Sequence, residues 1–154
     1  MNLPDADGIE ELARAALDLA CRARDAGEVP IGAVVALNGR IVGSGHNRTL
    51  LDCDPTAHAE VVAMRAAALA VGNHRLTGAV LVTTLEPCLM CCGAAVHARI
   101  GTLAHAADDP KAGALAVLAE LTSRGRLNHA MKLVRAPYAA ESAALLQAFF
   151  QSRR

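Results

Sequence analysis

The chain has 154 residues and no net formal charge, with 15 basic and 15 acidic side chains. A hydrophobic content of 53% excludes a disordered protein, and the length fits one domain, residues 1–154. No apolar run reaches the roughly 18 residues of a membrane span, and the acidic stretch 1–7 lacks the apolar core of a signal peptide. We therefore expect a cytoplasmic protein that does not associate with membranes.

The hydrophobic periodicity predicts alternating helices and strands. In chain order, the predicted elements are a helix at 8–26, strands at 31–37 and 41–45, a helix at 57–71, a strand at 79–85, a helix at 88–99, a strand at 100–106, a helix at 114–121, a strand at 131–134 and a helix at 138–151. Asn38-Gly39 is typical of a type I′ hairpin turn. Thr56 is expected to cap the second helix, and Pro87 to open the third. This alternation predicts a layered α/β domain.

Charge and aromatic residues are unevenly distributed. Residues 1–30 hold seven acids and three bases, whereas residues 121–154 hold six bases and one acid. A basic end is compatible with a polyanionic partner, although an ordinary solvated surface gives the same pattern. The only aromatic residues are Tyr138, Phe149 and Phe150, so the core must be aliphatic. The paired Phe residues are either a core plug or a stacking surface.

The cysteines indicate metal or redox chemistry. Three of the five lie within residues 88–92. Cys88 and Cys91 form C-x-x-C at a predicted helix start, where both sulfurs share one face and the helix field favours thiolates. Cys92 lies four residues after Cys88, so spacing alone lets it replace Cys91. A C-x-x-C motif by itself also fits a redox pair.

A second motif, His58-Ala59-Glu60, lies 30 residues upstream at another predicted helix start. One His and two Cys leave a fourth coordination position open, as in catalytic zinc sites. Glu60 is about 200° around a helix from His58, which suits a carboxylate near the metal rather than on it. Together the two motifs predict a catalytic zinc site.

The combination H-x-E with P-C-x-x-C is the signature of zinc deaminases. At these residues the sequence resembles the bacterial tRNA adenosine deaminases of the cytidine deaminase-like superfamily, from Glu28 to Arg154. The similar stretches are 28–34, 54–60, 84–94, 97–101, 109–114, Asn128-His129 and Phe149-Phe150 followed by Arg153-Arg154. The zinc motifs fit any member of the superfamily, and the later motifs narrow the resemblance to the tRNA branch.

The resemblance implies a fold and a reaction. The fold is a three-layer α/β/α arrangement with a central mixed five-stranded sheet, forming one zinc deaminase domain of the CMP/dCMP type. One zinc ion per subunit is held by His58, Cys88 and Cys91 and lowers the pKa of its water to about 7. Glu60 takes that proton, delivers it to N1 of adenine and later protonates the leaving amine. Adenosine at the wobble position (34) of tRNA becomes inosine, and we expect arginine tRNA with anticodon ACG as the substrate.

The resemblance also implies contacts to the tRNA anticodon loop. Asn47 holds the target nucleotide, Asp109 and Lys111 touch the RNA near the flipped base, and Phe149 and Phe150 pack against or stack on the loop. Arg153 belongs to the same basic ending. The implied partner besides tRNA is a second copy of the chain; DNA is not expected. Cys92 is interpreted as core filling. The departures from the family pattern are His46, His105, Asp108 and Gln151, each of which weakens the electrostatic case for RNA.

Three other functions share parts of this pattern. A deaminase of a free nucleobase or nucleoside (guanine, cytosine or adenosine) needs the same zinc site and Glu60, but not a basic, aromatic C-terminus. A catalytically silent zinc subunit that helps a partner bind tRNA can dispense with Glu60. A redox C-x-x-C protein has no use for His58 and Glu60.

Overall fold

The structure is a computed structural model that describes residues 4–154; the first three residues of the acidic stretch 1–7 lie outside this range. Its helices are α1 (Ala6–Asp25), α2 (Ala59–Val71), α3 (Leu89–His97), α4 (Leu115–Ser123) and α5 (Ala139–Gln151). Its strands are β1 (Gly32–Leu37), β2 (Arg40–His46), β3 (Val80–Leu85), β4 (Thr102–Ala107) and β5 (Lys132–Arg135). Every predicted element is present, with bounds that differ by up to two residues.

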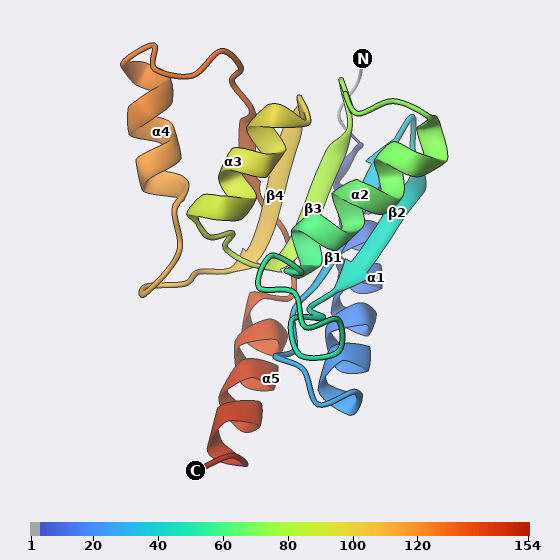
Figure 1. The fold of residues 1–154 in the computed structure, drawn as a ribbon, viewed down its shortest axis with the longest axis vertical. Helices are drawn as coiled ribbons and strands as arrows, with labels where there is room; N and C mark the ends of the chain where they lie inside the picture. Colours follow the sequence, from blue (N-terminus) through green and yellow to red (C-terminus); the bar gives the residue numbers. More distant parts are fainter. Residues whose placement is uncertain (1–3) are drawn as a thin grey trace.

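The five strands form one mixed sheet in the order β2-β1-β3-β4-β5. β1 pairs antiparallel with β2 and β3, whereas β3, β4 and β5 run parallel. Helices α2 and α3 cover one face of the sheet, and α1 and α5 lie on the other (Figure 1). The expected three-layer α/β/α fold with a five-stranded mixed sheet is confirmed.

Both faces of the sheet are buried by small aliphatic residues. Alternating positions of β1 divide between the two faces, with Ala33 and Val35 packing toward α2 and Val34 and Ala36 toward α1. Helices approach the sheet closely, since a Cβ added at Gly32 would lie 2.0 Å from the Ala16 carbonyl oxygen in α1. Because the helices lie close to the sheet, small side chains are enough to fill a core that has few aromatic residues.

Two local predictions need correction. Thr56 does not cap α2: the N-cap is His58, and both the Thr56 N–H and its hydroxyl bind the Asp54 carboxylate instead. Pro87 does not occupy the first turn of α3, because that helix begins at Leu89 with Cys88 as its N-cap. The predicted type I′ turn is confirmed by positive φ angles of 52° and 76° at Asn38 and Gly39.

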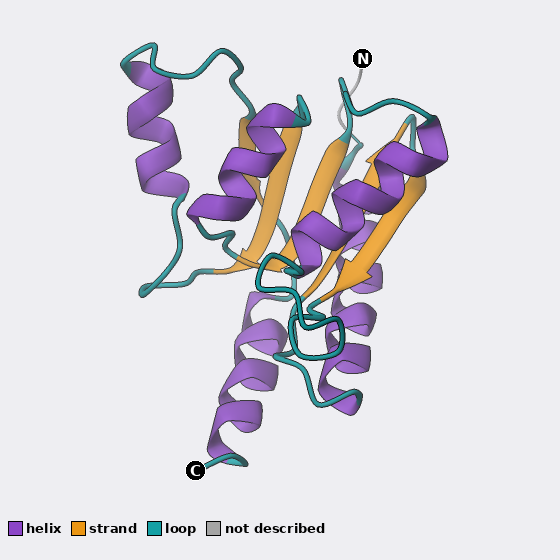
Figure 2. Cartoon of the chain, viewed as in Figure 1, coloured by secondary structure: helices purple, strands orange, loops and turns teal. Residues whose placement is uncertain are grey.

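The arrangement brings several loops to one edge of the sheet. The long loop between β2 and α2 lies at the same edge as the end of β3 and the start of α3 (Figure 2). Helices α2 and α3 both begin there, so their first residues face each other. Within residues 4–154 the chain contains no helix long and apolar enough to cross a membrane.

Candidate active site

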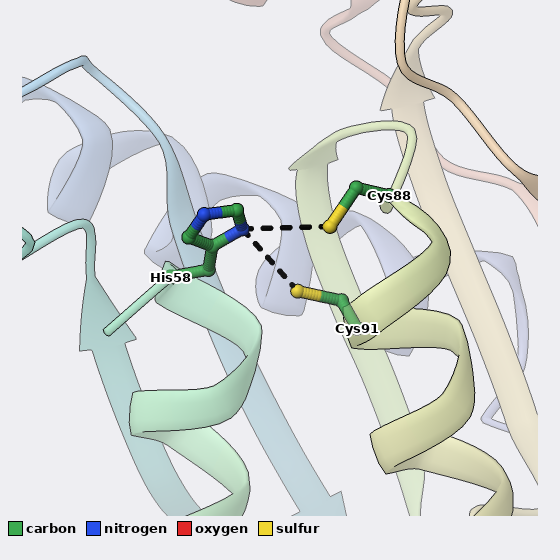
Figure 3. Close-up of side chains that lie close together, drawn as sticks. All are labelled: His58, Cys88 and Cys91. Atoms are coloured by element: carbon green, nitrogen blue, oxygen red, sulfur yellow. Dashed lines mark hydrogen bonds between the residues drawn. The ribbon is translucent and has the colours of Figure 1, made fainter. Parts of the chain in front are cut away.

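His58, Cys88 and Cys91 come together where α2 and α3 begin. The Nδ1 atom of His58 lies 3.5 Å from the Cys88 sulfur and 3.6 Å from the Cys91 sulfur. Figure 3 shows the imidazole facing both sulfurs across the gap between the two helices. Neither His58 nor Cys88 caps its own helix with its side chain. Both side chains are instead turned toward the shared centre.

The spacing of these donor atoms suits a tetrahedral metal ion. Zinc bonds of about 2.1 Å to nitrogen and about 2.3 Å to sulfur place the two donors about 3.6 Å apart at the tetrahedral angle. The observed separations of 3.5 and 3.6 Å agree with this value. The group contains only these three protein donors among the described residues, which leaves a coordination position open.

The thiol environment argues against a redox pair. Burial, followed by the nearby Glu60 carboxylate and the Cys88 sulfur, raises the pKa of the Cys91 thiol far above its usual range. The Cys91 thiol is therefore protonated in the metal-free protein, whereas the helix start alone predicts a thiolate. A buried neutral thiol is a poor nucleophile. Because metal ligation requires the thiolate, a bound cation has to displace this proton.

Cys92 is turned away from the metal donors. It is buried with Val96, Ala114 and Leu118, between α3 and α4. Its sulfur lies 3.7 Å from the Pro87 carbonyl oxygen, and burial raises its pKa to about 12. This placement agrees with the interpretation of Cys92 as core filling and leaves Cys91 as the second sulfur donor.

Glu60 lies beside the metal donors without joining them. Its carboxylate accepts a hydrogen bond from the Cys91 thiol at 3.4 Å and one from the Thr83 hydroxyl on β3, also at 3.4 Å. The side chain is almost wholly buried, and this burial raises the pKa of its carboxyl group. A carboxyl group whose pKa lies above its usual range is suited to proton transfer.

A cleft of about 850 Å³ lies at the same edge of the sheet. Its apolar wall includes Val29, Ile31 and Leu85, and Leu85 is followed within three residues by Cys88. Four of the predicted substrate-binding residues line it: Asp109, Lys111, Phe150 and Arg153. Asp109 also accepts hydrogen bonds from the Lys111 and Ala112 N–H groups, which shapes its loop.

The two adjacent Phe residues of α5 differ in environment. Phe150 is 51% exposed and lines the cleft, whereas Phe149 is 6% exposed and packs inside. The Arg153 guanidinium lies 3.5 Å above the Phe149 ring and donates a hydrogen bond to the Gly27 carbonyl oxygen. Phe149 thus supports Arg153 at the border of the cleft, and Phe150 is the ring available to a ligand.

The negative charge of Asp108 is balanced within the protein. Its carboxylate lies 2.8 Å from the Arg135 guanidinium and 3.0 Å from the Nε2 atom of His105. The Arg135 guanidinium, through hydrogen bonding, and then His105 lower the pKa of the Asp108 carboxyl group. Asp108 therefore adds little net negative charge beside the cleft, while Arg135 is occupied and is not a free cation.

Glu28 and Glu86, to which the sequence analysis assigns no role, hold the loops at this edge of the sheet through hydrogen bonds. Glu28 is fully buried and accepts hydrogen bonds from Asn47, Thr49 and the Leu51 N–H. Glu86 accepts hydrogen bonds from the N–H groups of Asp109 and Leu115, at the two ends of the loop that borders the cleft. The signal in the sequence is a single acid within an otherwise apolar stretch, in Glu28-Val29-Pro30-Ile31 and Leu85-Glu86-Pro87.

The sequence and the fold are similar to those of known deaminases. Residues 7–107 match the model of the cytidine and deoxycytidylate deaminase zinc-binding region. The tRNA-specific adenosine deaminase of Haemophilus influenzae is 41% identical over 94% of this chain and 84% of that protein. A solved structure from a study of A-to-I editing by tRNA:A34 deaminases is 42% identical, with a TM-score of 0.83 over 88% of this chain and 99% of that one. The guanine deaminase of Bacillus subtilis is 28% identical, with a TM-score of 0.62 over 92% of this chain and 93% of that one. The chain therefore belongs to the cytidine and deoxycytidylate deaminase zinc-binding family, and within it to the tRNA-specific adenosine deaminases.

Proposed function

We propose that this chain deaminates adenosine to inosine at the wobble position (34) of a tRNA. The observation that carries the proposal is the convergence of one imidazole, two thiols and the buried Glu60 carboxylate at one edge of the sheet. A cleft with apolar, aromatic and basic lining lies at the same edge. The relatives that are similar over most of the chain are named for this substrate class.

We assign one zinc ion per chain to His58, Cys88 and Cys91. The bound ion supplies an activated water nucleophile at neutral pH. Glu60 carries the two protons of the attacking water in turn: it transfers the first to N1 of adenine and the second to the departing amine, which leaves as ammonia. Its burial beside Thr83 keeps the carboxylate in place and limits exchange of the carried proton with bulk water.

The cleft supplies contacts suited to a single-stranded RNA loop. The exposed ring of Phe150 offers a stacking surface for a base. Lys111, Arg153 and Arg154 place three positive charges around the cleft, where the phosphate backbone of the anticodon loop passes. Asn47 and Asp109 hold the target nucleotide and its neighbour. Phe149 acts through Arg153, on which its ring is stacked.

We further propose arginine tRNA with anticodon ACG as the substrate, a cytoplasmic location and a homodimer. In support of the dimer, an open groove between α2 and α3 is lined by the apolar Val61, Met64, Ala68, Ala94 and Ala98 and by the polar Arg65, His74 and His97. Leu69 of α2 is 85% exposed. A second copy of the chain would remove this apolar surface from water. Light scattering that gives a particle of monomer mass at working concentration would contradict the dimer.

The substrate assignment is tested by comparing the activity of the protein on different substrate classes. Zinc-loaded protein is incubated with an arginine tRNA transcript bearing A at the first anticodon position, and separately with free adenosine, cytidine and guanine. Inosine at the wobble position alone supports the proposal. Ammonia released from a free base or nucleoside, with the tRNA unchanged, would assign the protein to the small-molecule deaminases.

A further inference from the structure

Glu28 is a buried carboxylate whose hydrogen bonds all come from one loop. It lies after α1 and is fully buried. One oxygen accepts the Leu51 N–H at 2.7 Å, and the other accepts the Asn47 side-chain amide at 3.0 Å and the Thr49 hydroxyl at 3.4 Å. A buried charge is tolerated when such hydrogen bonds satisfy it. The loop at residues 47–51 is therefore wrapped around this carboxylate.

The contact with Glu28 determines which way the Asn47 amide points. A carboxylate only accepts hydrogen bonds, so the NH₂ end of Asn47 must face Glu28. The same nitrogen lies 3.4 Å from the Thr49 hydroxyl oxygen. Within residues 4–154 the carbonyl oxygen of Asn47 receives no hydrogen bond, and it is not among the buried polar atoms left without a partner, His105 Nδ1 and Ser142 Oγ. The end of the amide that stays available to a ligand is the acceptor.

The backbone at Asn47 is hydrogen-bonded to the cleft wall, and that of the next residue to the segment before the metal donors. Its own N–H donates to the carbonyl oxygen of Ile31, which lines the cleft. The next residue, Arg48, donates its N–H to the carbonyl oxygen of Ala57, the residue before His58. These two contacts place the backbone of residues 47–48 beside both the cleft wall and the segment that ends at His58.

We propose that Glu28 is a positioning residue that fixes Asn47 as a hydrogen-bond acceptor, so that Asn47 binds a donor group of the target nucleotide. This inference rests on the proposed function. The ring nitrogens N1, N3 and N7 of adenine are acceptors and do not bind an acceptor. The donors of an adenosine within RNA are its exocyclic amine and its ribose 2′-hydroxyl. Asn47 binds one of these two groups and not a ring nitrogen.

An exchange of acid and amide between the two positions tests the proposal. In Glu28→Gln, the oxygen of the new side chain still accepts the Leu51 N–H, and its NH₂ group faces Asn47. The Asn47 amide then has to turn its oxygen toward that NH₂ group. Its own NH₂ group is left facing the substrate. In Asn47→Asp, two carboxylates face each other at about the 3.0 Å of the native contact. Loss of one hydrogen bond to a charged group predicts that each single variant lowers kcat/KM for the tRNA at least about tenfold, mainly through KM.

The double variant Glu28→Gln/Asn47→Asp restores both the internal hydrogen bond and an acceptor facing the substrate, with the net charge unchanged. We expect its kcat/KM to return to within about threefold of the wild type. The matched control is Glu86→Gln/Asn47→Asp, since Glu86 holds a different loop, and this pair should show no recovery. Zinc content and the melting temperature of the metal-free protein are measured for every variant, so that a folding defect is separated from a substrate effect.

The possible outcomes are distinct. Recovery of the melting temperature in the double variant without recovery of kcat/KM would overturn the acceptor role. Single variants with wild-type kinetics would overturn the positioning role of Glu28, whereas a wild-type protein that forms no inosine would instead contradict the proposed function. Placing 2′-deoxyadenosine at the target position identifies the donor: a rate penalty that disappears in Asn47→Ala assigns it to the 2′-hydroxyl, and an unchanged penalty assigns it to the amine.

Discussion

Cys91 and Cys92 form a matched pair for testing the metal centre, because they are adjacent, buried to the same degree and chemically identical. Only Cys91 faces His58, at 3.6 Å, whereas Cys92 packs against Val96 and Leu118. Replacing either by Ala removes one buried sulfur, roughly equivalent to one buried methylene, and should cost about 1 kcal/mol in the metal-free protein. For a chain of this size that is about 2–4 °C in melting temperature.

The two variants should separate when zinc is added. Free zinc at about 100 times its dissociation constant stabilises a single site by about 2.7 kcal/mol, or roughly 5–10 °C here. The assay is thermal unfolding with and without zinc at one protein concentration, together with zinc content after desalting. We expect the wild type and Cys92→Ala to gain stability and retain zinc, and Cys91→Ala to do neither. Zinc retained by Cys91→Ala and lost by Cys92→Ala would refute the ligand assignment.

Three further predictions follow from burial, hydrogen bonding and close packing. Phe150→Ala should raise KM for the tRNA about tenfold with little change in melting temperature, whereas Phe149→Ala should lower stability by about 3–5 kcal/mol; equal effects on KM and stability would contradict the assigned environments. Hydrogen bonds from the Thr56 hydroxyl and N–H lower the pKa of Asp54, so its stabilisation is present above the unfolded pKa of about 4 and is lost as the pH falls through the folded value. The metal-free Asp54→Asn variant should therefore lose less stability than the wild type between neutral and acid pH, as measured by thermal unfolding. Gly43→Ala should destabilise by at least about 1–3 kcal/mol, because the added Cβ would lie 2.3 Å from the Ala63 carbonyl oxygen of α2; unchanged unfolding in urea would show that this helix can move away.

The elements of the fold were predictable because their signals are local. The helical spacing of apolar residues in α1 and the uncharged, mostly apolar run of β3 each identify one element without reference to the rest of the chain. The cap of α2 was not predictable in this way. Thr56 is a good capping residue by type, but the position is taken by His58, whose side chain is turned toward two cysteines about 30 residues later in the chain.

The convergence of His58, Cys88 and Cys91 was expected from the two motifs together with the family resemblance, whereas the residues that support them were not. The partners of Glu28 lie 19 to 23 residues away in a loop, and those of Glu86 lie 23 and 29 residues away. The charge of Asp108 is balanced by Arg135 on the neighbouring strand, 27 residues later. Adjacent positions such as Phe149 and Phe150 point about 100° apart on a helix, so which one is buried depends on where α5 packs. Each of these facts depends on tertiary packing.

The most direct test of the central claim compares the wild type with Glu60→Gln on the same arginine tRNA transcript. Gln keeps the size of Glu60 and one of its two accepting oxygens, but it cannot carry a proton between water, N1 and the leaving amine. We expect both proteins to hold zinc equally, and inosine formation to fall at least about 100-fold in the variant. A Glu60→Gln protein that retains zinc and forms inosine at the wild-type rate would contradict the assigned role of Glu60 and the mechanism built on it.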